Sequence, residues 1–454
     1  MSNKVDQTFC LDSRQTAYKN LLTEVLHIAK KKGATQVEAS ISYALGFSVT
    51  VRMQEVETIE HHRDKTLEIS VYFGQTKGSA SSADFSVAAI ENVVEAACRI
   101  ASFTSPDPFA GLAEPSLLAK SPPDLDLYHF WAIDPQRAIE FGKDCEASAL
   151  AVDNRIAISE GVTLSTNQDL YLYANSNDFM GSYPSSRHSL SCNLVAKDKS
   201  GMQRDGSYTV SRNPTQLVPI RTLAKQAAEA VLKRLHARRL VTCQVPVIFH
   251  AEIAESLIRA FLSAISGENL YRGASFLVNY LDKPLFCNKI NIYEKPHVMQ
   301  GLGSAPFDAE GVATQDRTLV SQGVLQSYLL SSYSARKLGL QTTGNAGGAY
   351  NIILEGNSQL SLEELIKKMD RGLLLTELLG QGINLVTGDY SRGAVGFWIE
   401  RGQIQYPVEE ITVAGNLRDM YQNIVAIGSD IDHRSSILTG SILLENMMIA
   451  GCSN

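Results

Sequence analysis

The amino-acid sequence predicts an α+β fold, in which an N-terminal α/β region with antiparallel strands is followed by a large β-rich C-terminal domain. The first half of the chain alternates helical apolar spacing with the two-residue spacing of half-buried strands. Five of the 14 prolines lie within residues 106–123, as in a linker. Beyond Gln300 the chain holds 20 of its 32 glycines among short β-like runs, which is typical of strands joined by tight turns.

The length of 454 residues leaves room for two or three domains, because one domain usually has about 150 residues. The proline-rich stretch sets the first boundary, and the change to a glycine-rich texture near Val245 sets the last. We predict an N-terminal helix-strand domain over 1–105, a Pro-rich linker over 106–125, a central α+β domain over 126–240 and a β-rich C-terminal domain over 241–454.

In the N-terminal region, apolar residues recur at helical spacing from Tyr18, and Gly33 stands where a helix C-cap is expected. Three runs that alternate apolar and polar residues follow, and they predict a meander of three antiparallel strands over 37–41, 47–53 and 67–73. A second helix is expected over about 86–103. In the central region, Pro135 opens a helix and another helix begins near Pro219, with strand-like runs between them.

Composition and charge exclude several functions. The net charge of −7 makes a broad cationic surface improbable, so we expect no nucleic-acid partner. The opening residues lack the order of a signal peptide, and no apolar run approaches the ~18 residues of a membrane span, so we expect a cytoplasmic protein. Seven scattered cysteines without a CxxC pair argue against a disulfide framework and a cysteine zinc site.

A first candidate site lies in residues 245–267, which read as a buried strand that leads into a helix. His250 and Glu255 fall at the helix entrance, and zinc accepts both imidazole and carboxylate ligands. A spacing of five residues, however, separates the two side chains by roughly 140° around a helix. Residue types alone therefore favour a structural histidine, with Glu252 and Glu255 favourable near the positive end of the helix.

A second candidate is the tract 380–420, where glycines, aromatics and charges alternate closely. One interpretation is a sheet edge that receives an extended peptide, with Arg392 holding a carboxylate. The other is a run of β-hairpins with Tyr390, Phe397 and Trp398 in the core, and residue types leave both open. The sequence has no GxGxxG, P-loop or GxSxG motif, so these signatures point to no other catalytic site.

Several strings together resemble one known family. They include YFGQTKGSASSADFS, SSRHSLS, SAPFDAEGV, SSYSARKLGLQTTGNAGG and TGDYSRGAVGFWIERGQIQYPVEEITVAGNLRDM, with a closing IAG. On these strings, which span about 70–451, the chain resembles the TldD/PmbA family and specifically its PmbA branch. The resemblance implies an α+β architecture and a role in cytoplasmic proteolysis. The family's older label, modulator of DNA gyrase, implies an indirect effect here.

The resemblance also implies partners. TldD-type subunits are zinc metallopeptidases with an HExxxH helix and a later cysteine, and they associate with PmbA-type subunits. Such pairs trim or degrade short unfolded polypeptides, for example microcin precursors and antitoxins. We therefore expect a TldD-type subunit as partner in a heterodimer, a possible homodimer when the chain is alone, and unfolded peptide as substrate.

The active-site pattern is broken in this chain. HAEIAESL aligns with the HExxxH segment and places His250 at the first histidine, Ala251 at the general-base glutamate and Glu255 at the second histidine. The later cysteine falls near Thr439. A register shifted by one residue keeps Glu252 but loses both histidines. We thus assign no catalytic residue, and we regard His250 and Glu255 as vestigial metal positions.

The expected role is that of a noncatalytic subunit. The lone chain should hold no cofactor, and zinc should reside in the TldD-type partner. The expected substrate or partner surface is formed by Asp389, Tyr390, Arg392 and Asn416. Two alternatives stay open: a self-sufficient metallopeptidase that adds His297 or His433 as a third ligand, and a non-enzymatic adaptor that captures peptides through residues 388–420.

Overall fold

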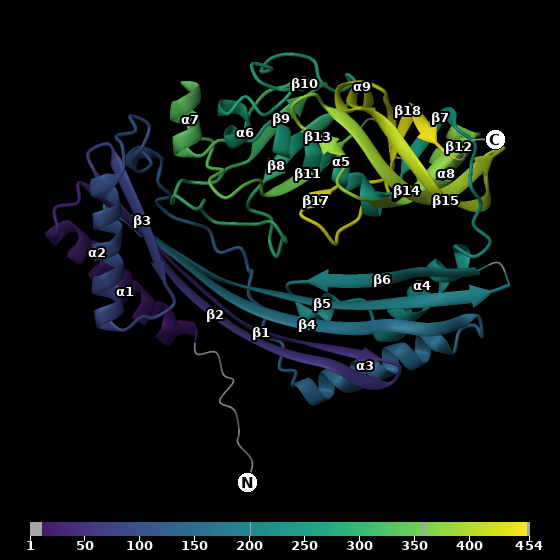
Figure 1. The fold of residues 1–454 in the computed structure, drawn as a ribbon, viewed down its shortest axis with the longest axis horizontal. Coiled ribbons are helices and arrows are strands. Elements are labelled where there is room, and N and C mark those ends of the chain that lie inside the picture. Colours follow the sequence, from purple (N-terminus) through teal and green to yellow (C-terminus); the bar gives the residue numbers. More distant parts are fainter. Residues whose placement is uncertain (1–10, 200, 357–359, 452–454) are drawn as a thin grey trace, which may run out of the picture.

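A long, curved antiparallel sheet organises the N-terminal half of the chain. The computed structural model describes residues 11–199, 201–356 and 360–451. The six strands of this sheet run in the order β3-β2-β1-β4-β5-β6. They are β1 (Gln36–Arg52), β2 (Glu55–Phe73), β3 (Thr76–Ser82), β4 (Ile156–Asn175), β5 (Met180–Asp198) and β6 (Gly201–Ser211). Figure 1 shows the sheet as an arc, with the C-terminal half of the chain on its concave side.

Two of the three short strands expected in this region form a single strand. The run 37–41 and residues 47–52 of the second run belong to the single, 17-residue β1, so the prediction of separate strands is wrong. Gly46, between them, makes no turn. An added Cβ there would lie 2.3 Å from the carbonyl oxygen of Thr166, so this glycine lets β4 approach closely. Because β1 pairs with β4, residues from the first and central predicted domains share one sheet, and the domain boundaries stay a prediction.

Four helices cover this sheet. α1 (Leu11–Lys31) packs on β1 and β4, α2 (Val87–Phe103) packs on β2 and β3, and α3 (Pro135–Leu150) and α4 (Ile220–Lys233) pack toward the other end of the sheet. The predicted helices are confirmed, although α1 begins earlier than the apolar spacing indicates. Their buried residues, such as Val25, Val94, Ala138 and Val231, meet alternate side chains of the sheet. The α+β class is confirmed as well.

The proline-rich segment between α2 and α3 is held in place. It carries one short 3₁₀ turn, η1 (Pro115–Leu117), and buries Leu112, Ala113 and Leu118. The guanidinium of Arg336 donates to the carbonyls of Phe109 and Gly111, both at 2.7 Å. The segment therefore connects the two halves of the chain by specific contacts and does not act as a flexible spacer.

The C-terminal half contains two further sheets. The five-stranded sheet has the order β10-β9-β8-β11-β17 and is formed by β8 (Asn291–Lys295), β9 (Arg317–Ser321), β10 (Val324–Leu325), β11 (Asn351–Glu355) and β17 (Ile437–Leu438). The seven-stranded sheet is formed by β7 (Cys243–Phe249), β12 (Gly372–Leu379), β13 (Ile383–Asn384), β14 (Asp389–Glu400), β15 (Gln403–Asn416), β16 (Ile424–Ile427) and β18 (Ile442–Ala450). Five helices accompany them: α5 (Ala251–Ala264), α6 (Gly267–Tyr271), α7 (Ser332–Leu338), α8 (Leu362–Met369) and α9 (Leu417–Gln422).

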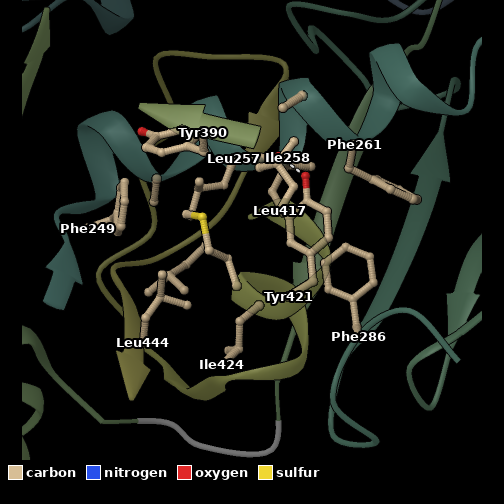
Figure 2. Packing of buried hydrophobic residues seen from close by; sticks show 14 of the residues in the cluster. Phe249, Leu257, Ile258, Phe261, Phe286, Tyr390, Leu417, Tyr421, Ile424 and Leu444 are labelled. Atoms are coloured by element: carbon tan, nitrogen blue, oxygen red, sulfur yellow. Dashed lines mark hydrogen bonds between the residues drawn. The ribbon is translucent and has the colours of Figure 1, made fainter. Parts of the chain in front are cut away.

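The core of the C-terminal half fixes α5, the helix that follows β7. Figure 2 shows Leu257, Ile258 and Phe261 of α5 packed with aromatic side chains from other elements. The rings of Phe286 and Tyr421 stack with their centroids 4.4 Å apart. The Tyr421 hydroxyl donates to the Leu257 carbonyl at 2.9 Å. Burial of a large side chain contributes about 1.5–3 kcal/mol, so these contacts hold α5 firmly against the core.

Two further sequence expectations concern cysteines and membranes. Cys98, Cys145, Cys192, Cys243 and Cys287 are free thiols. Cys10 and Cys452 lie outside the described residues. Within the described ranges, no helix combines the length and the apolar character needed to cross a membrane.

Candidate functional site

His250 stands between β7 and α5, where it acts as the N-cap of the helix. Its backbone N–H donates to the Leu375 carbonyl at 3.0 Å, which ties the helix entrance to β12. Its Nδ1 accepts from the Glu252 backbone N–H at 3.4 Å. A cap of this kind satisfies one of the four amide groups that a helix start leaves unpaired. One ring nitrogen of His250 is therefore engaged in local structure.

Glu255 lies one turn further along α5 and is bound by neighbouring side chains. Its Oε1 accepts from Arg259 at 3.1 Å, and its Oε2 accepts from the Ser435 hydroxyl. Among the described residues, no hydrogen bond connects Glu255 with His250. His250 and Glu255 therefore have different hydrogen-bond partners and do not act as a pair.

Arg434, which the sequence reading missed, is the centre of the helix entrance. Its guanidinium donates to both carboxylate oxygens of Asp432, at 2.8 and 2.9 Å, and to Glu252 at 2.5 Å. It also covers the ring of Tyr208 at 4.4 Å and donates to the Tyr208 carbonyl at 3.3 Å. We call Arg434, Asp432, Glu252, Glu255 and Ser435 the entrance network. It connects α5 with a loop 180 residues later and with β6.

The guanidinium of Arg434 offsets the negative charge of the carboxylates in the entrance network. Burial acts to raise the pKa of Asp432, but the hydrogen bonds from Arg434 outweigh it and hold that pKa below its ordinary value. Burial acts to lower the pKa of Arg434, and the bonds to Asp432 and Glu252 outweigh it and raise the pKa. The carboxylates around the helix entrance therefore already have a permanent positive partner.

Thr439 is buried, and its hydroxyl donates to the neighbouring Gly440 carbonyl at 2.9 Å. The side chain that contacts the start of α5 is Ser441, whose hydroxyl accepts from the Ala251 N–H at 3.0 Å and donates to the Asp430 carboxylate at 2.6 Å. The signal that could have pointed to this loop is the density of charged and hydroxyl residues between Gly428 and Gly440.

The residues at the helix entrance do not fit a zinc ion. Across residues 11–199, 201–356 and 360–451, no group of three or more His, Cys, Asp or Glu side chains gathers in an arrangement that could hold a metal. His297 is bound instead to the Thr314 hydroxyl at 2.8 Å, and burial lowers its pKa. His433 is exposed. Neither one joins His250 and Glu255 in a ligand set.

The residues of the second candidate surface have different structural roles. Asn416 donates to the Asp389 carboxylate at 3.2 Å and to the Thr387 carbonyl at 3.0 Å, and it caps α9 by accepting from the Arg418 N–H at 3.1 Å. Hydrogen bonds from Thr387 and Asn416 lower the pKa of Asp389. Asp389 and Asn416 therefore brace a turn between β13, β14 and α9.

Tyr390 belongs to the core, where its ring meets Phe249, as Figure 2 shows. Arg392, two residues along β14, is half-buried, and its Nε has no hydrogen-bond partner among the described residues. β14 pairs with β15 on one side and with β12 and β13 on the other. The strand is internal, so an extended peptide does not find a free sheet edge there. The hairpin interpretation fits this register.

Comparison with known protein families finds matches along most of the chain. Residues 37–101 match PmbA/TldA metallopeptidase domain 1, residues 128–235 match the central domain of that family, and residues 242–451 match its C-terminal domain. These matches cover most of the sequence and follow one another in order. The chain belongs to the PmbA/TldD family.

Individual relatives agree with this placement. A protein named metalloprotease PmbA homolog, from Haemophilus influenzae, is 45% identical and covers 98% of this chain and 99% of its own length. Metalloprotease PmbA from Escherichia coli O157:H7 is also 45% identical, with 97% and 98% covered. A crystal structure from Bacteroides thetaiotaomicron, described as a modulator of DNA gyrase, aligns with a TM-score of 0.90 at 27% identity, covering 96% of this chain and 99% of its own.

Proposed function

We propose that this chain is the noncatalytic, PmbA-type subunit of a two-subunit metalloprotease system, in which a TldD-type subunit carries the zinc and performs hydrolysis. The observation that supports this role is the helix entrance. Ala251 offers a methyl group where the family pattern has a general base. The nearby carboxylates are engaged by Arg434 and Ser435.

The chemical reason is the demand that hydrolysis makes on a zinc site. A catalytic zinc takes about three protein ligands, and a base must accept the proton of the bound water. Removal of the base alone typically costs ~10²–10⁴-fold in rate. This chain lacks the base, and its candidate ligands are bound elsewhere, so both requirements fail at one place.

The proposed system acts in the cytoplasm on short unfolded polypeptides such as microcin precursors or antitoxins. The chain contributes walls and docking surface to a heterodimer, and a homodimer of the lone chain uses related surfaces. Direct contact with DNA has no part in this proposal, because the net charge of −7 disfavours it.

Co-purification with the TldD-type protein of the same cell tests the proposal, followed by cleavage of an unfolded peptide by each subunit and by the mixture. The expected result is a stable complex that cleaves peptide in a chelator-sensitive way, while this chain alone does not. Chelator-sensitive cleavage by the lone chain would support the self-sufficient enzyme. Peptide binding by the lone chain with no products from the mixture would support the adaptor.

A further inference from the structure

A cavity of about 610 Å³ lies between the N-terminal sheet and the C-terminal half, away from the entrance network. Strands β1, β2 and β4 supply one wall, the proline-rich segment supplies a second, and residues around Glu310 and Tyr333 supply the third. Figure 1 shows α7, which carries Tyr333, above the end of the sheet where β3 and α2 lie. The volume of the cavity is in the range of pockets that bind a small molecule or a side chain.

The walls carry a surplus of negative charge. Glu38, Glu68, Asp107 and Glu310 line the cavity, and among its described lining residues Lys77 is the only basic one. Lys77 is already paired with Glu38 at 3.3 Å. Glu38 also accepts from the hydroxyls of Tyr72 and Tyr173, at 2.8 and 3.0 Å. Glu38 is therefore fully engaged.

Asp107 is also engaged, because it accepts from the Tyr333 hydroxyl at 2.7 Å and lies 3.9 Å from Lys337. Arg336 uses its guanidinium to hold the carbonyls of the proline-rich segment. Two of the carboxylates that line the cavity can still accept hydrogen bonds from a ligand. Glu310 accepts one backbone N–H, from Ser332 at 2.8 Å, and the exposed Glu68 carboxylate has no hydrogen bond in the described part of the chain.

Aromatic rings complete the walls. Tyr72, Tyr171, Tyr173 and Tyr333 line the cavity, and burial raises the pKa of Tyr72, Tyr171 and Tyr173, which keeps these phenols neutral. Ring faces attract cations, and Lys77 already lies 5.3 Å from the Tyr72 ring centre. Neutral rings beside carboxylates that have no ion-pair partner among the described residues favour a cation and disfavour phosphate or carboxylate ligands.

We propose that this cavity binds an organic cation, an ammonium or guanidinium group, with Glu68 and Glu310 as its counter-charges and Tyr171 as an aromatic contact. A lysine or arginine residue of a peptide and a free small amine share this chemistry. Binding here needs neither zinc nor a partner subunit, so it can be tested on the lone chain, independently of the role proposed above.

Isothermal titration of the full-length chain at low ionic strength provides the test. The probes are a blocked pentapeptide, acetyl-Gly-Gly-Arg-Gly-Gly-amide, the same peptide with glutamine in place of arginine, and arginine amide. The arginine peptide is expected to bind at least tenfold more tightly than the glutamine peptide. Tighter binding of the peptide than of arginine amide identifies a peptide residue as the natural ligand, and the reverse order identifies a free amine. Either order supports a cation site.

Variants locate the binding. Glu68→Gln and Glu310→Gln are each expected to weaken binding of the arginine peptide about fivefold. Tyr171→Leu is expected to weaken this binding more than Tyr171→Phe does, because phenylalanine keeps the ring. Glu91→Gln is the matched control, because it removes the same charge from an exposed position on α2 that does not line the cavity. Thermal unfolding confirms that each variant is folded. Equal binding of the two peptides, no measurable binding, or equal weakening by Glu91→Gln would overturn the proposal.

Discussion

At the scale of single residues, Arg434 supplies the positive charge that pairs with Asp432 and Glu252 at the helix entrance. Its side chain is 21% exposed, and that of Asp432 is 11% exposed, so their interaction is only partly screened by water. A sequence pattern does not reveal the contact between Arg434 and Glu252, because these two residues are 182 positions apart and belong to no motif. In contrast, the departures from the active-site pattern at Ala251 and Thr439 can be recognised from the sequence alone.

Replacing Arg434 therefore should destabilise the fold. Arg434→Gln leaves Asp432 without its guanidinium, and we expect a loss of about 2–3 kcal/mol in the free energy of unfolding, measured with urea. Arg259→Gln is the control, because the Arg259 side chain is 60% exposed and its ion pair with Glu255 contributes less than about 0.5 kcal/mol. Equal losses in the two variants would contradict the central role of Arg434.

Asp308 gives the protein a pH-dependent stability. It is 2% exposed, and burial together with repulsion from Glu310 raises its pKa to about 7, although the N–H groups of Glu310, Val312 and Ala346 oppose the rise. The folded chain thus holds this proton at pH values where the unfolded chain, with a pKa of 3.8, has released it. The free energy of unfolding consequently falls as pH rises from about 4 to about 7.

Asp308→Asn tests this dependence. Urea unfolding at pH 5 and pH 8 should show wild-type protein less stable at pH 8, by an amount on the order of a few kcal/mol from this group. In the variant, the difference between the two pH values should shrink, because asparagine does not titrate. An unchanged difference would show that other groups control the pH dependence.

At the scale of elements, the sequence predicts helices well and long strands poorly. Apolar spacing with capping and proline signals locates α2, α3 and α4 closely. The alternation of apolar and polar residues divides β1 into the separate runs 37–41 and 47–53, although the strand continues through Gly46. Whether a glycine bends a chain or admits a neighbour depends on the strand that packs beside it, here β4, and β4 comes more than 100 residues later.

Gly46→Ala tests the close approach of β1 and β4. The new methyl group would meet the Thr166 carbonyl, so we expect a loss of about 2–4 kcal/mol, read from the urea midpoint. Ser42→Ala, at an exposed position of the same strand, is expected to change stability by less than about 0.5 kcal/mol. A Gly46→Ala protein as stable as Ser42→Ala would mean that the strands can separate at little cost.

At the scale of the whole molecule, buried arginines hold the two halves together. The guanidinium of Arg212, at the end of β6, donates to the Gly301 and Leu302 carbonyls of the C-terminal half at 2.9 and 3.0 Å, and to the Ser186 carbonyl at 3.2 Å. Arg234, which follows α4, pairs with Glu377 of β12. Sequence patterns identify these arginines as charged residues but not as contacts between halves.

Arg212→Leu should weaken this attachment. The variant removes a guanidinium that donates to three carbonyls, and we expect a loss of about 2–4 kcal/mol in the free energy of unfolding. Limited proteolysis should cleave the loop that contains Gly301 faster than in wild-type protein, because that loop loses its anchor. Unchanged stability together with unchanged proteolysis would show that the other contacts suffice.

If the chain supports hydrolysis without performing it, the imidazole of His250 should not be needed for activity. His250→Asn keeps a good helix cap while it removes the imidazole, so it separates the structural from the metal-binding role. If the chain is noncatalytic, this variant should form the same complex with the TldD-type subunit, and the complex should cleave peptide at the wild-type rate.

Zinc content and peptide cleavage, measured side by side on the purified lone chain, on its His250→Asn variant and on each in complex with the TldD-type subunit, test this account most directly. We predict far less than one zinc per lone chain and no cleavage without the partner, with equal zinc and equal rates in the two complexes. Near-stoichiometric zinc in the wild-type lone chain, with chelator-sensitive cleavage that His250→Asn abolishes, would contradict it.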